Sequence, residues 1–323
     1  MTTQMPGEVY ALLAAFTWAC AMVLFKYSGE RVSPLALNLF KNTVAILLLG
    51  LTLLVAPRLQ PFLADESLNC VLTLPARHIW ILVVSGVIGI ALADTLFFYS
   101  LNFVGVGIAS IVDCLYTPFM ILFSWLILSE QLTAAHFLGA ALILSGVLIS
   151  SGHAPPPNTT RGQLLAGILF GALAMASMAY GIVIAKRVLE QFPLIWAAVI
   201  RLLAGTLALA AVALASPRRN ALWSVFRPSA AWKTAVPGAI LGTFLAYVFW
   251  VAGFKYADAS INAILNQTTV IFAIILATVI VKEPLTKRKL VAVLLAVLGA
   301  LAVLHEHVQD LLQSVPWKLI TDI

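Results

Sequence analysis

The segment PLALNLFKNTVAILLLGLTLLVA, residues 34–56, is a long apolar run that contains one ionisable side chain, Lys41. A helix needs about 20 apolar residues to cross the ~30 Å hydrocarbon core of a bilayer, and this segment is long enough. A charge at membrane depth is costly, so it usually faces a cavity, a partner or a pathway. Residues 34–56 therefore predict a membrane-spanning helix whose charged side faces a protein interior.

Nine further stretches of similar length and hydropathy occupy most of the remaining chain. Hydrophobic residues make up 62% of the 323 positions and charged residues 10%, against about half and about a quarter in an ordinary soluble domain. Backbone polar groups in lipid must be paired internally, and the alternation typical of a membrane barrel is absent, so these stretches predict helices. The expected spans, with approximate ends, are 7–26, 34–56, 78–101, 105–128, 134–151, 163–185, 193–215, 233–254, 259–281 and 287–304.

The two halves of the chain are similar to each other. Residues 89–148 align without a gap with residues 242–301, and a second alignment pairs Lys41 with Arg201. Five spans in each half would give the halves opposite orientations, as in many secondary transporters, whose binding site lies between the repeats near the membrane mid-plane. The sequence thus predicts an all-α integral membrane protein with ten transmembrane helices, built as two inverted five-helix repeats.

Polar and proline-rich segments mark the boundaries of this arrangement. Small residues spaced four apart at Gly167/Gly171 and Gly238/Gly242 predict close helix packing, and Pro118 predicts a kink within its span. The expected division is a first repeat at 1–151, a linker at 152–162, a second repeat at 163–304 and a C-terminal tail at 305–323, which we expect to lie on the membrane surface as an interfacial helix.

A short motif recurs before the last span of each half, as Glu130-Gln-Leu-Thr133 and as Glu283-Pro-Leu-Thr286. Together with ten spans divided five plus five and glycines in those last spans, it resembles the EamA-type branch of the drug/metabolite transporter superfamily. The resemblance covers about residues 7–304. It implies a carrier of small organic metabolites, often an exporter of amino acids or related compounds, in which Glu130 and Glu283 have a structural role in turns.

Four ionisable residues lie deep within the expected spans. At ~1.5 Å per helical residue, Lys41, Asp94 and Asp113 lie about 10–12 Å from one membrane face, and Arg201 lies at a similar depth from the other. Because the hydrocarbon core is ~30 Å thick, the two layers are less than ~10 Å apart, and one small molecule could touch both. Other candidate substrate-binding residues at these depths are Trp18, Asn38, Asn42, Tyr180, Tyr247, Asn266 and Gln267.

Two cations and two carboxylates around one cavity suit a zwitterionic substrate. Arginine can hold a carboxylate with two parallel hydrogen bonds, whereas lysine acts as a point charge. Either Asp94 or Asp113 could also carry a coupling proton. The structural alternative is an ion pair between Lys41 and one of the two acids, with the Arg201 guanidinium bonded to helix-end carbonyls.

The function expected from these features is secondary transport of a small polar metabolite by alternating access. The expected substrate class is an amino acid or a related zwitterion, aromatic ones included. We expect no enzymatic activity, no cofactor, no bound metal and no nucleic-acid partner. The expected partners are the substrate and membrane lipid. Two rivals are a nucleotide-sugar or other metabolite antiporter of the same superfamily and, less favoured, an intramembrane aspartyl hydrolase with Asp94 and Asp113 as its dyad.

The expected location is a bacterial inner (plasma) membrane, crossed several times. Loop Lys and Arg are more frequent on the face opposite the N-terminus, and the positive-inside rule then places both termini outside. The resembled family usually has both termini inside, so the two arguments about orientation conflict.

Overall fold

The computed structural model describes residues 6–55, 75–129, 134–151, 160–217, 219–256, 262, 265–266, 268–282 and 284–314. Every regular element in these ranges is a helix, which confirms the predicted all-α class. Six helical segments are long and apolar enough to cross a membrane: Gly7–Gly29, Pro34–Val55, Ala76–Asp113, Arg161–Gln191, Leu194–Ala215 and Trp232–Tyr256. Two shorter apolar helices are Tyr116–Leu128 and Thr268–Val281. The count of ten spans stays a prediction.

In the described residues of the first half, two of the helical regions contain a π-helical segment (η). Its elements are α1 (Gly7–Gly29), α2 (Pro34–Val55), α4 (Ala76–Gly86), η2 (Val87–Leu92), α5 (Ala93–Asp113), α6 (Tyr116–Phe123), η3 (Ser124–Leu128) and α7 (Ala134–Ser151).

The second half begins at Thr160, whose side chain forms a reciprocal capping box with Gln163 at the start of α8. Its elements are α8 (Arg161–Gln191), α9 (Leu194–Ala215), the short α10 (Arg219–Trp223), a 3-10 turn η4 (Ser224–Phe226), α11 (Trp232–Gly238), the π-helix η5 (Ala239–Ala246), α12 (Tyr247–Tyr256), α14 (Thr268–Leu276), the π-helix η6 (Ala277–Val281) and α15 (Lys287–Ser314).

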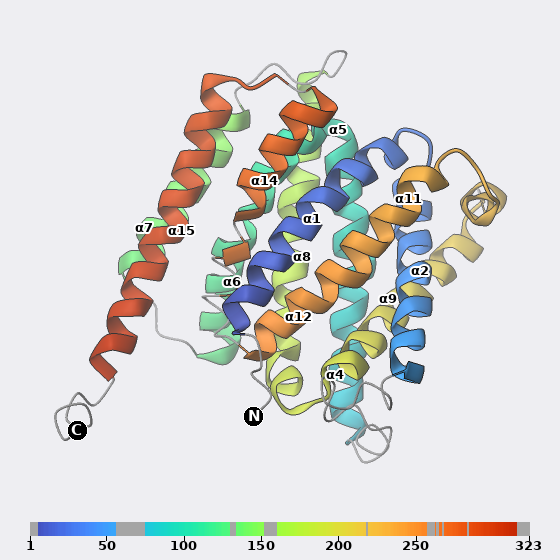
Figure 1. Ribbon diagram of the computed structural model, residues 1–323, viewed down its shortest axis with the longest axis horizontal. Coiled ribbons are helices and arrows are strands. Elements are labelled where there is room, and N and C mark those ends of the chain that lie inside the picture. The colour runs from blue at the N-terminus through green and yellow to red at the C-terminus, as the bar shows by residue number, and fades with distance from the viewer. Residues whose placement is uncertain are drawn as a thin grey trace.

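The two halves pack into each other rather than side by side. Helix α1 of the first half packs against α11, η5, α12 and α14 of the second, and α8 of the second half packs against α4, η2, α5 and α6 of the first. Helix α2 packs against α9 (Figure 1). Helices α7 and α15 lie side by side along one edge of the bundle (Figure 1). Each half therefore supplies helices to the interior walls of the other.

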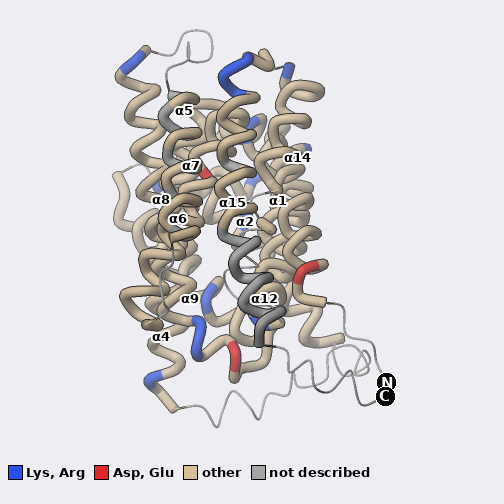
Figure 2. The backbone as a smooth tube through the Cα atoms, turned by 90° about the vertical axis from the view of Figure 1, so that its left-hand side faces the viewer, with Lys and Arg blue, Asp and Glu red and all other residues tan. Residues whose placement is uncertain are grey.

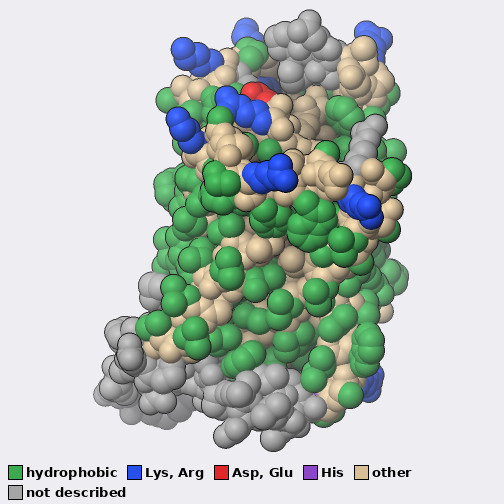
Figure 3. Space-filling view, turned by 90° about the vertical axis from the view of Figure 1, so that its right-hand side faces the viewer, with side chains coloured by type: hydrophobic (Ala, Val, Ile, Leu, Met, Phe, Trp, Pro, Cys, Tyr) green, Lys and Arg blue, Asp and Glu red, His purple; other side chains and the backbone are tan. Residues whose placement is uncertain are grey.

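The surface is suited to lipid along the middle of the bundle. Lys and Arg gather toward the two ends of the helices, with long uncharged stretches between them (Figure 2). On the face shown in Figure 3, hydrophobic side chains cover the middle, and Lys and Arg lie toward the ends. Leu54 and Val279 are 80% and 71% exposed, which would be unfavourable in water and is favourable in a hydrocarbon core. The chain is therefore an integral membrane protein that crosses the bilayer several times.

Two interruptions divide the long helical path from α5 to α6. Gly105 has φ 76°, a left-handed conformation that favours glycine, and it kinks α5 at the predicted boundary between the third and fourth spans. The second interruption lies at Cys114–Leu115, one turn before Pro118. Pro118 has no N–H to donate to the carbonyl of Cys114, which instead accepts from Thr117 at 3.3 Å. The predicted kink at Pro118 is confirmed, and it leaves Asp113 at a helix end.

Local structure recurs at positions that the alignment of residues 89–148 with 242–301 pairs. The π-helix η3 aligns residue for residue with η6, and η2 aligns within η5. Ser129 and Lys282, which also align, both adopt a left-handed conformation, with φ 62° and φ 59°. Non-glycine residues rarely adopt this conformation, so its recurrence at matched positions is unlikely to arise by chance.

Several of the predicted segments lie partly outside the described residues. These include the linker residues 152–159, Glu130 and Glu283 of the two turn motifs, and the end of the tail at 315–323. Helix α15 continues past the predicted end of the last span at 304 to Ser314. The interfacial helix in the tail and the structural role of Glu130 and Glu283 stay predictions.

Glycines permit the closest helix contacts. The two predicted packing motifs are confirmed: a Cβ at Gly171 would lie 2.8 Å from Ser100 Oγ, and a Cβ at Gly242 would lie 2.6 Å from Ala21 Cβ. At Gly86, a Cβ would collide with the backbone carbonyl of Arg201. Helix α4 thus meets α9 backbone to backbone beside Arg201.

The substitution Gly86→Ala is expected to destabilise the protein by about 2–3 kcal/mol, because the backbone atoms that it meets cannot move aside as a flexible side chain would. Thermal unfolding of the detergent-solubilised protein would measure the change. Gly50→Ala is the matched control, since no atom lies within 4 Å of a Cβ at that position. A similar effect of both substitutions would contradict this account of the α4–α9 contact.

Candidate functional site

Lys41 and Asp94 form an ion pair in the interior of the bundle. Lys41 Nζ lies 2.6 Å from Asp94 Oδ2, and the two residues are only 2% and 8% exposed. Lys41 lies on α2, and Asp94 lies in the first turn of α5, directly after η2. A buried ion pair needs further hydrogen bonds to offset the loss of water. Lys41 Nζ makes one, donating to Asn42 Oδ1 at 2.8 Å.

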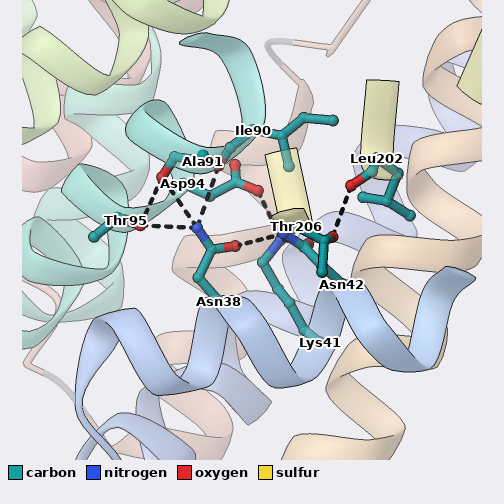
Figure 4. Close-up of polar contacts among 9 residues, drawn as sticks. All are labelled: Asn38, Lys41, Asn42, Ile90, Ala91, Asp94, Thr95, Leu202 and Thr206. Atoms are coloured by element: carbon teal, nitrogen blue, oxygen red, sulfur yellow. Dashed lines mark hydrogen bonds and ion pairs between the residues drawn. The ribbon is translucent and has the colours of Figure 1, made fainter. Parts of the chain in front are cut away.

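A chain of side-chain amides holds this pair in place (Figure 4). Asn42 Nδ2 donates to Asn38 Oδ1 at 3.1 Å, and Asn38 Nδ2 donates to Thr95 Oγ1 at 2.9 Å. Asn38 Nδ2 also lies 3.2 and 3.3 Å from the carbonyl oxygens of Ile90 and Ala91 in η2. Asn38 and Asn42 therefore fix α2 against η2 and α5, and they orient Lys41 toward Asp94.

Arg201 is a buried cation that makes no ion pair among the described residues, and the Asp94 carboxylate interacts with it only at longer range. It is 1% exposed, and its Nε and Nη1 atoms have no hydrogen-bond partner in the part of the chain that the structure describes. The guanidinium carbon lies 5.9 Å from the ring centre of Tyr247 and 5.7 Å from that of Trp250. These aromatic contacts attract the cation but accept no hydrogen bond in its plane. The expected bonding of Arg201 to helix-end carbonyls is not seen for these atoms.

The guanidinium packs against the backbone at Gly89. A Cβ at Gly89 would lie 3.5 Å from Arg201 Nη2, which is an ordinary van der Waals contact. A buried charge that lacks a partner is costly. An arginine held in this way is ready to accept an anionic group from a ligand.

Asp113 ends helix α5 at the interruption before Pro118. Within the described residues, no hydrogen bond or ion pair joins its carboxylate to another side chain. The hydroxyl of Tyr116, three residues further on, is buried and also lacks a hydrogen-bond partner in the described structure. A carboxylate at the C-terminus of a helix faces the negative end of the helix dipole, so a cation or a proton would stabilise it there.

These groups surround one cavity of about 110 Å³. For scale, an engineered apolar cavity of about 150 Å³ holds one benzene molecule. This cavity is smaller, so a ligand of that size or larger requires its walls to move apart. The first half contributes Ala14, Trp18, Lys41, Gly89, Ile90, Asp94, Asp113 and Tyr116, and the second half contributes Met178, Arg201, Leu202, Gly242, Thr243, Ala246, Tyr247, Trp250, Asn266 and Thr269. The cavity thus lies between the two halves, and its polar groups come from both.

Comparison with known proteins agrees with this arrangement. A sequence profile of the EamA-like transporter family matches residues 5–152 and 165–305, one match in each half. This chain belongs to the EamA-like transporter family. The resemblance seen in the spans and turn motifs is therefore confirmed, and the protein is a membrane transporter.

Solved structures share the fold of this EamA-like transporter, among them one described as a crystal structure of a protein. It is 21% identical in sequence and has a TM-score of 0.67, and the match covers 94% of this chain and 98% of that chain. At this identity the likeness shows the fold alone. A search of curated proteins finds no significant match.

Most of the candidate residues predicted for this EamA-like transporter meet at the cavity. Its lining includes Trp18, Lys41, Asp94, Asp113, Arg201, Tyr247 and Asn266. Gln267 lies outside the described residues. Their role in substrate binding stays a prediction. The geometry separates the two cations, because Lys41 forms an ion pair with Asp94 and Arg201 forms none in the described residues.

Three candidates do not line the cavity. Tyr180 is 37% exposed, packs edge-on against Phe123 and does not line this cavity, so its predicted role in substrate binding stays a prediction that the cavity does not support. Each residue turns an α-helix by about 100°, so Tyr180 points away from the cavity that Met178, two residues earlier, reaches. Asn38 and Asn42 are buried beside Lys41, where they bond to protein groups rather than facing the cavity.

Sequence reasoning missed two aromatic residues that line the cavity, Tyr116 and Trp250. Trp250 follows Tyr247 by three residues on the same helix, and residues three apart on a helix share a face, so that spacing carried a signal. Tyr116 begins a new helix after the interruption at Cys114–Leu115, so no helical spacing indicated its position. Tyr and Trp are usual at membrane interfaces, and that default drew attention away from Trp250 and Tyr116. In the structure, the rings of Tyr247 and Trp250 stack with centroids 6.1 Å apart.

Proposed function

We propose that this EamA-like transporter moves a small zwitterionic metabolite of the amino-acid class across a bacterial inner membrane by alternating access. One observation carries the proposal: a buried guanidinium and a carboxylate, neither in an ion pair among the described residues, line one cavity beside aromatic rings. A ligand with both a carboxylate and an ammonium would satisfy both groups at once. A ligand with only one of these charges would leave the other protein charge unpaired.

The carboxylate of the substrate would bind Arg201. A guanidinium offers parallel N–H donors that match the two oxygens of a carboxylate, and such charge-assisted bonds are about twice as strong as neutral ones. The unpaired hydroxyls of Tyr247 and Tyr116 are further donors near this cation, since both rings belong to the aromatic group around Trp250. Three donor-bearing side chains without partners favour an anionic group at this end of the cavity.

The ammonium of the substrate would pair with Asp113, and the aromatic rings would contact its side chain. A proton would compete with the ammonium for the same carboxylate. The exchange of one for the other gives a direct means of coupling substrate export to proton entry. Asp94 is less suited to this role because its carboxylate already accepts from Lys41.

Alternating access is supported by the recurrence of local structure in the two halves. The paired π-helices and the paired left-handed residues Ser129 and Lys282 indicate that each half is one copy of a repeated unit. Repeats with five spans each must be inverted, and such repeats can exchange conformations about a fixed central site. The cavity between the halves lies where that site is expected.

The two rival functions find less support. A nucleotide sugar carries phosphates that require several cations, whereas Arg201 is the one cavity-lining cation that makes no ion pair in the described structure. An aspartyl dyad needs two carboxylates that share a proton, but Asp94 is bonded to Lys41 instead.

Counterflow into proteoliposomes tests the proposed substrate class. The probes are phenylalanine and leucine, each compared with the amine that lacks its carboxylate and the acid that lacks its ammonium. We expect transport of at least one amino acid, with transport of both of its analogues reduced by tenfold or more. If neither amino acid is transported, or if the amine or the acid moves as fast as the parent, the zwitterion proposal is wrong.

The substitution Asp113→Asn is expected to make transport insensitive to an imposed pH gradient, because the amide cannot exchange a proton for an ammonium. Uptake measured with and without the gradient, in the same vesicles, checks this. Glu190→Gln is the control, since Glu190 pairs with Lys186 on the exposed surface and should leave the gradient effect intact. Retention of the gradient effect by Asp113→Asn would exclude this carboxylate as the coupling group.

A further inference from the structure

The two cations of the cavity occupy equivalent positions but have different neighbours. Sequence alignment pairs Lys41 with Arg201, and it pairs Asp94 with Tyr247. The structure preserves this correspondence in space: Lys41 Nζ lies 2.6 Å from Asp94, and the Arg201 guanidinium lies 5.9 Å from the Tyr247 ring. Each half thus places a cation beside a residue that closely follows its π-helix. In the first half that residue is the acid Asp94, which pairs with Lys41 and interacts with Arg201 only at longer range, whereas in the second half it is Tyr247.

This difference decides which cation is open to a ligand. A lysine ammonium has three N–H donors, and Asp94 and Asn42 already accept two of those of Lys41. The Nε and Nη1 atoms of Arg201 have no acceptor among the described residues. Both cations line the same cavity, in which Lys41 is ion-paired with Asp94, whereas Arg201 keeps hydrogen-bond donors open and interacts with Asp94 only at longer range.

We infer that Asp94 determines specificity by occupying the anion site of Lys41, so that the transporter accepts one acidic group per substrate, at Arg201, and excludes ligands with a second. The inference rests on the proposed function, in which Arg201 binds the single carboxylate of a zwitterion. Asp94 acts here as a built-in counter-anion. A dicarboxylate that reached toward Lys41 would meet the Asp94 carboxylate first.

Repulsion strengthens this exclusion. Two carboxylates that share one buried site cannot both stay ionised without a large cost, because little water is present to screen them. Discrimination of this kind relies on an unfavourable contact with the wrong ligand as well as a favourable contact with the right one. Asn42 accepts from Lys41 and Asn38 binds Asn42, so the ammonium that pairs with Asp94 is held in place.

The test is to remove the charge of Asp94 and measure the binding of a dicarboxylate. Asp94→Asn keeps the size of the side chain and leaves Lys41 with a neutral neighbour. The probe is succinate, with propionate as the matched monocarboxylate, and the readouts are the ligand-induced rise in Tm and the Kd from equilibrium dialysis. We expect succinate to bind Asp94→Asn at least tenfold more tightly than it binds the wild type, and propionate to change much less.

The double variant Lys41→Met/Asp94→Asn is expected to lose this gain, because the second cation is then absent. If the folded Asp94→Asn protein binds succinate no better than the wild type, the inference is wrong. The transport assay on phenylalanine and leucine is independent of this result. If Asp94→Asn binds succinate more tightly but the wild type transports neither amino acid, the proposed function is wrong. The inference that Asp94 blocks anion binding at Lys41 would still hold.

A mirror substitution covers the case in which Asp94→Asn does not fold. Tyr247→Asp places an acid beside Arg201, as Asp94 lies beside Lys41, and leaves the first pair intact. We expect it to weaken propionate binding at least tenfold more than Tyr247→Asn does, since only the acid neutralises Arg201. Equal effects of the two substitutions would show that charge at this position does not govern anion binding, and the inference would fall.

Discussion

Arg201→Met is expected to abolish transport while the protein stays folded. The substitution keeps a long apolar side chain but removes the cavity-lining cation that makes no ion pair in the described structure. Removing one partner of a buried, hydrogen-bonded charge pair typically costs about 2–5 kcal/mol, which corresponds to a loss of binding of at least about thirtyfold. Initial rates of uptake into proteoliposomes, measured at several substrate concentrations, would show the loss.

Stability provides the control for Arg201→Met. Because the wild-type guanidinium is 1% exposed and lacks hydrogen-bond partners at Nε and Nη1, its removal should leave Tm unchanged or raise it. Arg201→Lys keeps the charge but loses the forked geometry, so an intermediate rate is expected. Undiminished uptake by Arg201→Met would refute the assigned role, whereas a lost fold would show that Arg201 is structural.

Lys41→Met should act in the opposite way, by lowering stability. It leaves the buried Asp94 carboxylate without its counter-ion, and breaking a buried ion pair from one side typically costs about 3–5 kcal/mol. Protonation of Asp94 limits the loss, so the lower end of this range is expected. Thermal unfolding in detergent, at constant pH, would measure it.

A double-mutant cycle separates the ion pair from other effects of Lys41→Met. Lys41→Met/Asp94→Leu removes both charges, and it should recover at least half of the stability that Lys41→Met loses, since no unpaired charge remains. If the double variant is as unstable as the sum of the single variants, the pair contributes no coupling energy, and the ion pair does not explain the burial of Lys41.

The charged residues of the site were predictable from sequence because charged side chains are rare within membrane-spanning segments. Lys41, Asp94, Asp113 and Arg201 each interrupt an apolar span, and a charge at that depth requires a polar interior. Depth along a helix also follows from residue number alone. These two arguments sufficed to place all four residues at one cavity.

Direction around the helix was harder to predict than depth. Tyr180 was assigned to the pocket by its depth in the membrane, yet its side chain faces away from the cavity. Two residues along an α-helix change the depth by only about 3 Å but turn the side chain by about 200°, so depth alone does not predict which side of the helix a residue occupies. The choice of partner for Lys41 was also open between Asp94 and Asp113. The π-helix η2 settles it by changing the rotation of the chain just before Asp94, and no apolar periodicity in the sequence marks such a turn.

Close backbone contacts were only partly foreseen. The spacing of Gly167 and Gly171 indicated a packing face, but Gly86 has no partner glycine four residues away in the chain. Its close approach is to the carbonyl of Arg201 on another helix. Such a contact depends on how two distant segments cross, which a pattern within one segment does not contain.

Four of the eight tryptophans of this protein lie in two contrasting environments. Trp18 and Trp250 line the cavity, whereas Trp80 and Trp125 are 67% and 48% exposed on the outer surface. Indole fluorescence responds to its immediate surroundings, so a ligand in the cavity alters the emission of Trp18 and Trp250. Trp80 and Trp125 do not contact the ligand, and quenchers dissolved in the lipid reduce their emission selectively. The protein therefore carries an intrinsic optical reporter of occupancy that needs no label.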